Sequence, residues 1–255
     1  KILLKSNLVV GKVLSESTLA RMKNSILNDY KSKGYYSAEV TSKIKNIDKG
    51  KADIIIDIKV GKVVKIKSIN VVGNSNLATS KILKVMQLSE SGLLSMFFDN
   101  DLYSEEKLEM DLGAINALYL DNGFLDFKVI SHDVAFNDDK SVADITINVS
   151  EGYEYKISGY KLSGSVGVAK EEIIKQITIA KGDDFSRKNI LGIVEDINNL
   201  LANKGYANAN VNIGISNVDK INHTTEIDFA IRPGDKLYVK HIRFKNNYLT
   251  DDIIL

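Results

Sequence analysis

The chain has 255 residues, of which 44% are hydrophobic and 26% are charged, the balance of a folded globular protein rather than a disordered one. Its 34 basic and 33 acidic residues give a net charge of +1, so the composition gives no sign of a nucleic-acid-binding surface. No apolar run reaches the roughly 18 residues that a membrane-spanning helix needs. Cysteine is absent, which fits an oxidising compartment but is also common elsewhere.

One short pattern occurs three times, each time between a helix-like segment and a run of alternating residues. The pattern is a glycine followed by an aromatic residue, at Gly34, Gly123 and Gly205. A second glycine follows at Gly61, Gly152 and Gly234. Twelve residues further on lie Gly73, Gly164 and Asn246, and because Asn also tolerates positive φ, we expect a left-handed backbone at all three positions.

A helix is predicted before each of the first three glycines, and that glycine ends the helix. Each helix begins after a serine that we expect to be its N-cap, preceded by a large apolar residue: Leu14-Ser15, Tyr103-Ser104 and Phe185-Ser186. Apolar residues at helical spacing form one buried stripe in the second and third helices: Leu108, Leu112, Ile115 and Tyr119, then Ile190, Val194, Ile197 and Leu201. The first helix keeps Leu19, Ile26 and Tyr30 but carries Lys23 at the second position.

Two strand-like runs follow each glycine and are joined by polar residues typical of a hairpin. The first runs cover 37–44, 127–136 and 208–215, and the second cover 52–60, 142–149 and 225–231. Strict alternation in the second runs indicates that one face is packed and one is wet. Each unit therefore reads strand, helix, helix, strand, strand, which is an α+β fold.

The repeats divide the chain into four segments, which we call repeats one to four: residues 1–62, 63–153, 154–236 and 237–255. We expect repeat one to lack its first strand and repeat four to contain only the start of a unit, as in a piece of a longer array. Repeat two has nine residues more than repeat three between the corresponding glycines, and they fall within 89–103. This difference predicts a long loop between the helices of repeat two.

This arrangement resembles tandem POTRA domains, and in particular those of the periplasmic arm of outer-membrane β-barrel assembly proteins. The resemblance covers essentially the whole chain and rests on two motifs that recur at fixed offsets. The motif after the second helix reads GYYSAEV (34–40), and the motif that links to the next unit reads EGYEYKISGYKLSGS (151–165) and PGDKLYVKHIRFKNN (233–247). It implies a three-stranded mixed sheet covered by two antiparallel helices in each repeat. The long loop of repeat two is similar to that of the third POTRA domain of five, which would make this chain the second to fourth domains and the start of the fifth.

Catalytic chemistry is not indicated, and no cofactor or metal is expected. Three histidines, His132, His223 and His241, lie singly in strand-like runs. Neither Gly164-x-x-Gly167 nor Asp99-Asn100-Asp101 has the spacing of a nucleotide or calcium loop. A recurring acid at Asp53, Asp144 and Glu226 is better explained by cross-strand pairs or a solvated strand face than by a shared site.

Binding is the function that the sequence favours. The resemblance implies that the first strand of each hairpin is a sheet edge, where an extended peptide can add as a further strand. In repeat two this edge strand carries the candidate partner-binding residues Phe127, Val129, Ile130, Ser131, Val134 and Phe136, and a change of parity along it predicts a bulge. A second candidate is the apolar part of the long loop, with Leu93, Leu94, Met96, Phe97 and Phe98.

The resemblance implies a non-enzymatic scaffold on the periplasmic face of the outer membrane of a Gram-negative bacterium. The partners it implies are unfolded outer-membrane proteins, accessory lipoproteins of the assembly complex and a C-terminal membrane barrel of the same protein. Two alternatives stay open at this point. One is the POTRA array of a two-partner secretion or translocation pore, and the other is a purely structural surface repeat.

Overall fold

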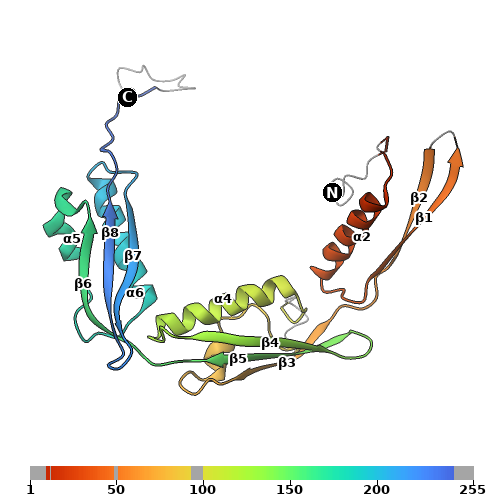
Figure 1. Ribbon diagram of the computed structural model, residues 1–255, viewed down its shortest axis with the longest axis horizontal. Coiled ribbons are helices and arrows are strands. Elements are labelled where there is room, and N and C mark those ends of the chain that lie inside the picture. Colours follow the sequence, from red (N-terminus) through yellow and green to blue (C-terminus); the bar gives the residue numbers. More distant parts are fainter. Residues whose placement is uncertain (1–9, 12, 49–50, 93–99, 244–255) are drawn as a thin grey trace, which may run out of the picture. The chain divides into compact units, whose positions relative to one another are not determined.

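The structure is a computed structural model (Figure 1) that describes the chain apart from residues 1–9, 12, 49–50, 93–99 and 244–255. The described chain separates into two compact parts, which are treated one at a time. The first part holds residues 1–120 and 126–152, and the second holds residues 121–125 and 153–255.

Repeat one contributes one helix and one hairpin to the first part. Helix α2 spans Glu16–Lys31, and the antiparallel strands β1 and β2 span Glu39–Asp48 and Lys51–Lys59. Ser15 caps the helix by accepting a hydrogen bond from the Thr18 N–H through its side chain. The predicted N-cap and the predicted hairpin are both present.

Repeat two forms a three-stranded mixed sheet with its longer helix lying along it (Figure 1). Its elements are β3 (Lys65–Val72), α3 (Thr79–Leu83), α4 (Glu105–Asp121), β4 (Lys128–Phe136) and β5 (Val142–Ser150). The strand order is β3-β5-β4, with β3 parallel and β4 antiparallel to the central β5. Both outer strands of this sheet are therefore edges.

Repeat three, in the second part, has the same topology with the order β6-β8-β7. Its elements are β6 (Lys156–Gly164), the 3-10 turn η1 (Val166–Val168), α5 (Lys170–Gln176), α6 (Arg187–Asn203), β7 (Asn210–Asp219) and β8 (Thr224–Arg232). The predicted α+β fold of tandem β-α-α-β-β units is confirmed.

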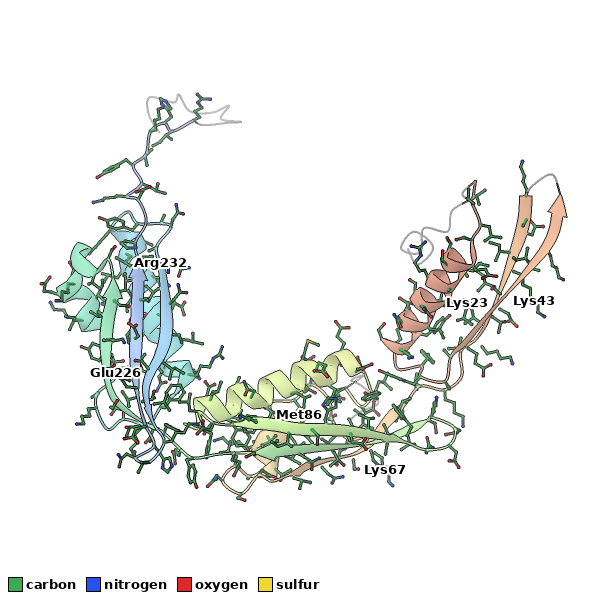
Figure 2. All side chains as sticks on the ribbon, viewed as in Figure 1. Lys23, Lys43, Lys67, Met86, Glu226 and Arg232 are labelled. Carbon is green, nitrogen blue, oxygen red and sulfur yellow. The ribbon has the colours of Figure 1, made fainter. Side chains whose placement is uncertain are left out.

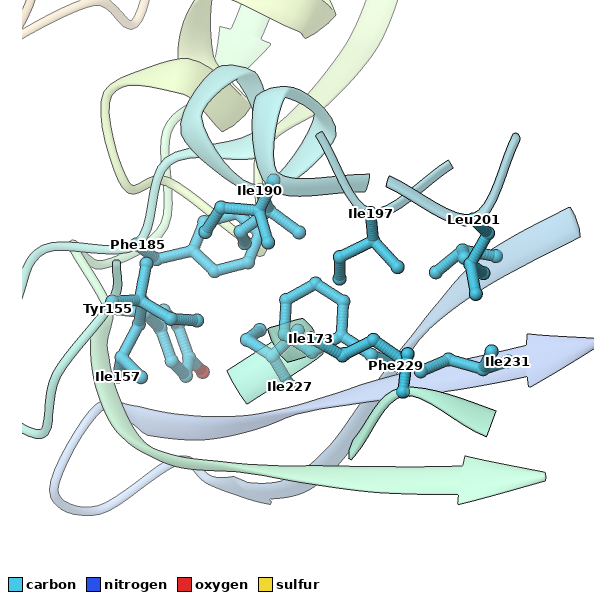
Figure 3. Close-up of a cluster of buried hydrophobic side chains, with 14 residues drawn as sticks. Tyr155, Ile157, Ile173, Phe185, Ile190, Ile197, Leu201, Ile227, Phe229 and Ile231 are labelled. Atoms are coloured by element: carbon cyan, nitrogen blue, oxygen red, sulfur yellow. The ribbon is translucent and has the colours of Figure 1, made fainter. Parts of the chain in front are cut away.

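The central strands bury one face, as their alternation predicts. In β5 the buried residues are Ala143, Ile145, Ile147 and Val149. In repeat three, Ile227, Phe229 and Ile231 of β8 pack against Ile190, Ile197 and Leu201 of α6 (Figure 3). This apolar area removed from water is the main stabilising contribution to each repeat.

The helix stripes differ from the prediction by one residue at the second position of each helix. The buried residues are Met22, Asp111 and Ile193, whereas Lys23, Leu112 and Val194, one residue later, are half-buried. In α2 the stripe differs at two more positions, because Thr18 is buried where Leu19 was expected and Tyr30 is half-buried. Because a helix has 3.6 residues per turn, the next buried residue can lie three or four positions further along. The rotation of the helix about its axis, as it packs on the sheet, decides which of the two is buried. Lys23 thus does not interrupt a core position.

The recurring glycines have the backbone that the sequence predicts. Gly73 and Gly164 adopt φ of +97° and +80°, whereas Asn246 lies outside the described residues. The helix-ending glycines also have positive φ, and each carbonyl accepts an N–H from the first two residues of the next repeat: Gly34 from Val64, Gly123 from Tyr155 and Gly205 from Leu237. Every connection between described repeats is therefore built in the same way.

Candidate functional site

The outer edge of β4 is the candidate site because its backbone groups are available there. Among the described residues, β4 pairs with β5 alone. The Asn137 N–H donates to the Val142 carbonyl, 3.1 Å away, at the closed end of this ladder. In an antiparallel ladder such residues alternate with residues whose N–H and C=O point away from the partner strand. The outward-facing residues of β4 are therefore His132, Val134 and Phe136.

A β-bulge interrupts β4 near its start. Val129 is opposite Val149 and Ser131 is opposite Asn148, so Ile130 is the extra residue. The bulge predicted from the change of parity is thus confirmed. Ile130 is 63% exposed, and a bulge re-aims the side chains on either side of it.

The side chains of the predicted edge residues fall into three environments. Phe127 is buried and stacks on Tyr119 with ring centroids 3.9 Å apart, so its side chain belongs to the core. Val129 and Val134 are half-buried, while Ile130 and Ser131 are exposed. The buried side chain of Phe127 is therefore not available to a partner at this edge, whereas the backbone of β4 and its exposed side chains are.

Phe136 takes part in an aromatic cluster that the sequence did not predict. Its ring lies 5.6 Å from that of Tyr36, the second aromatic residue of KGYY, and 5.5 Å from that of Tyr103. The Tyr36 hydroxyl also accepts the Glu105 N–H at the start of α4. This aromatic clasp (Tyr36, Tyr103 and Phe136) joins repeat one to the far end of β4. The recurring pattern gave no signal for it, because the other two repeats have Leu125 and Ala207 at the position of Tyr36.

The face of α4 beside this edge carries a charged group. His132 Nε2 on β4 lies 3.7 Å from Glu109 Oε1 on α4. Met110, the next residue, turns toward the loop after α3 instead, where its Sδ lies 3.9 Å from the Gln87 amide nitrogen. An extended peptide paired with β4 would therefore run alongside Glu109.

The apolar loop residues Leu93, Leu94, Met96, Phe97 and Phe98 lie outside the described residues. Both ends of their loop are described, and both bond to Ile66 of β3. The Ser91 N–H donates to the Ile66 carbonyl, and the Ile66 N–H donates to the Asp101 carbonyl. In repeat three the same two bonds to Ile157 involve Gly182 and Asp183, which adjoin in sequence. The extra residues of repeat two therefore lie between these two bonds.

Strands β1 and β7 occupy the corresponding position in the other repeats. By register, Ile215 opposite Ile227 matches Val134 opposite Ile145. The irregularity of β7 lies at its far end, between Ser216 and Asp219. Ile215 is 47% exposed, so repeat three offers a second apolar edge of the same type.

The residues that invite a catalytic reading have structural partners. Asp101 is buried and holds Lys65 Nζ at 3.0 Å and the Ser91 hydroxyl at 3.1 Å. The ring of His223 stacks on that of Tyr153, 4.1 Å apart. No group of three or more His, Cys, Asp or Glu residues in the described chain is arranged to hold a metal ion.

The recurring acids form cross-strand contacts. Asp144 accepts from the Ser68 hydroxyl on β3, whereas Glu226 (Figure 2) accepts from the Asn217 amide on β7, 2.8 Å away. Because the two acids bond to opposite neighbours of their central strands, they are parts of different contacts. The interpretation as cross-strand pairs is confirmed for these two.

A polar pocket of about 620 Å³ lies near the start of repeat three. Its lining includes Ser186, Asn189 and Lys156, whose Nζ is paired with the Asp184 carboxylate. This pocket has no histidine or cysteine in its lining. No helix in the described ranges is both long and apolar enough to cross a membrane.

The fold and the open edges define a class of protein, namely a tandem array of small α+β modules that present strands at sheet edges. The model of the POTRA family, described as surface antigen variable number repeat, matches residues 1–61, 64–152 and 155–234. The chain belongs to the POTRA family.

Curated relatives carry the name outer membrane protein assembly factor BamA. The protein from Neisseria meningitidis serogroup B is 27% identical over 252 residues, 97% of this chain and 31% of the relative. The protein from Buchnera aphidicola subsp. Acyrthosiphon pisum is 33% identical over 202 residues, 79% of this chain and 33% of the relative. The chain thus spans about a third of the length of these relatives.

A solved structure shows the same likeness. The crystal structure of Haemophilus influenzae BamA POTRA3-5 matches with a TM-score of 0.58 and 27% identity, covering 75% of this chain and 74% of that one. The assignment of this chain to the second, third and fourth domains of an array is not tested by this match and stays a prediction.

Proposed function

We propose that this chain is the peptide-binding part of an outer-membrane protein assembly factor, working at the periplasmic face of the outer membrane. It holds unfolded outer-membrane proteins by strand addition and catalyses no reaction. The names of the curated relatives support the process, and the family supports the type of module. The observation that carries the mechanism is the open outer edge of β4.

Strand addition suits a substrate class with many different sequences. The bonds that hold the added strand run between main-chain groups, so they form with nearly any side chains. Proteins that become β-barrels alternate apolar and polar residues, and the exposed Ile130 on β4 favours the apolar ones. The corresponding strands β1 and β7 add weak contacts along one substrate, which raises avidity.

Further partners follow from the resemblance alone. They are the accessory lipoproteins of the assembly complex and the C-terminal membrane barrel of the same protein. Strand addition at β4 does not depend on either of them, so it is testable on this chain in isolation.

The decisive variant removes one outward N–H from β4. Val134→Pro deletes a donor that does not bond to β5, and proline is tolerated at such an edge position. Val134→Ala is the matched control because it shortens the side chain but keeps the N–H. Each variant is compared with the wild-type chain by circular dichroism and thermal unfolding to verify the fold.

The probe is a synthetic peptide with the alternating pattern of an outer-membrane β-strand, titrated into the ¹⁵N-labelled chain. We expect amide shifts at His132 and Val134 in the wild type and in Val134→Ala. We expect Val134→Pro to weaken binding at this edge about tenfold, the effect of one lost hydrogen bond. Unchanged affinity in a folded Val134→Pro chain would contradict the proposal.

A further inference from the structure

The sheet of repeat two has a second edge, on β3, and this edge is largely covered. The loop that follows α3 pairs with it through three backbone bonds. Ile66 exchanges two bonds with Ser91 and Asp101, each 2.8 Å long, and the Tyr103 N–H donates to the Val64 carbonyl at 3.0 Å. Peptides therefore cannot pair with the first half of β3 without displacing this loop.

The next backbone N–H of β3 that points away from β5 already donates to a side chain. After the irregularity at Lys67 (labelled in Figure 2), the Ile69 N–H donates to Glu90 Oε1, 2.9 Å away. A carboxylate is a strong acceptor for a backbone N–H. Glu90 thus occupies the place that the carbonyl of an added strand would take.

Repeat three has the same backbone arrangement on β6. Ile157 exchanges bonds with Gly182 and Asp183, and the Phe185 N–H donates to the Tyr155 carbonyl. The register irregularity also recurs, between Ile157 and Gly159. Tyr160, opposite Ile227, therefore corresponds to Ile69, opposite Ile145, and its N–H points outward in the same way.

The closing carboxylate is missing at this point of repeat three. Ser91 corresponds to Gly182 through their shared bond, so Glu90 corresponds to Lys181. An ammonium group has three donors and no acceptor, so it cannot close the Tyr160 amide. In the described part of the chain, no side chain or loop carbonyl is placed to accept from the Tyr160 N–H.

We infer that the outer edge of β6, at Tyr160 and Leu162, is a second strand-docking site, on the opposite side of its sheet from β7. Its occupant is an extended polypeptide whose carbonyl accepts the Tyr160 N–H and which carries an acidic side chain toward the exposed Lys181. Glu90 keeps the matching edge of repeat two closed, so repeat three alone of these two binds on both sides. The inference rests on the strand addition proposed above.

Exchanging the two side chains tests this difference without any ligand. Native-state hydrogen exchange on the whole chain measures the protection of the Ile69 and Tyr160 amides. We expect Ile69 to be protected and Tyr160 to exchange fast in the wild type. Glu90→Lys should lower the protection of Ile69 about tenfold, and Lys181→Glu should raise that of Tyr160 by a similar factor. Equal protection of the two amides in the wild type would overturn the inference.

Binding is then measured with an alternating peptide that contains one glutamate, and with its glutamine analogue. We expect Lys181→Glu to remove the shifts at Tyr160 and Leu162, whereas Lys181→Ala keeps them and only abolishes the preference for glutamate. Val134→Pro should leave these shifts intact, which separates this site from the β4 edge. If the peptide binds β4 but causes no shift at β6, the second site is refuted and the proposed function stands.

Discussion

The hydroxyl of Tyr119, on α4, donates to Glu151 Oε1 at the end of β5, 2.8 Å away, inside the core of repeat two. The same carboxylate accepts the backbone N–H groups of Ser75, Asn76 and Leu77, in the loop after β3. Glu151 therefore ties together the helix, the central strand and the turn that begins at Gly73. Burial alone raises the pKa of Glu151, but these donors outweigh it and hold its pKa below the usual value.

Replacing Glu151 by glutamine should weaken repeat two in a pH-dependent manner. The folded state lowers this pKa, so the stabilisation is complete above the unfolded value of about 4.3 and is lost as the pH falls through the folded value. We expect Glu151→Gln to cost about 2–4 kcal/mol at pH 7 and less at pH 3. Hydrogen exchange of the Ile145 and Ile147 amides measures this cost, with the exposed Asp138→Asn as control. An equal cost at both pH values would argue against this role of the charge.

Replacing Gly73 by alanine should destabilise the same repeat by about 2–4 kcal/mol. Gly73 has φ of +97°, and an added Cβ would collide with the Val149 carbonyl oxygen. Gly113→Ala is the control, since Gly113 lies in α4 with open space at its Cβ, and it should stabilise by about 0.5–1 kcal/mol. Thermal unfolding of the two variants should move in opposite directions, and a shared direction would contradict this explanation.

Phe127 and Ile130, both candidates for partner contact, should behave in opposite ways. Phe127 is buried against Tyr119, so Phe127→Ala should cost about 3–5 kcal/mol. Ile130 is exposed on the bulge, so Ile130→Ala should change stability by less than about 0.5 kcal/mol but weaken peptide binding. The exchange of β5 amides gives the first quantity, and peptide titration gives the second. A stable Phe127→Ala chain would show that this ring is not a core residue.

The aromatic clasp gives a graded pair of variants. Tyr36→Phe removes only the acceptor for the Glu105 N–H, which should cost about 0.5–1.5 kcal/mol. Tyr36→Ala also removes the ring contacts with Tyr103 and Phe136, and should cost roughly 2–4 kcal/mol. The measurement is thermal unfolding together with the exchange rate of the Glu105 amide. Equal losses in both variants would assign the whole effect to the hydrogen bond.

The sequence by itself determined the features that follow from short-range rules. Positive φ at Gly73 and Gly164, the serine caps of the helices and the alternation in β5 and β8 each depend on a few neighbouring residues. The offsets between the repeats then place these features in every unit. The bulge near Ile130 was also visible, because a bulge shifts the side-chain parity of a strand.

Only the tertiary structure decided which backbone groups and side chains remain available for binding. Glu90, in the loop after α3, accepts the N–H of Ile69 on β3, and the ring of Phe136 contacts that of Tyr36 of another repeat, 100 residues earlier in the chain. The choice between Asp111 and Leu112 as the buried residue depended on how α4 rolls on its sheet. These outcomes depend on contacts between segments that are distant in sequence. The local sequence around a residue does not specify which distant segment will pack against it.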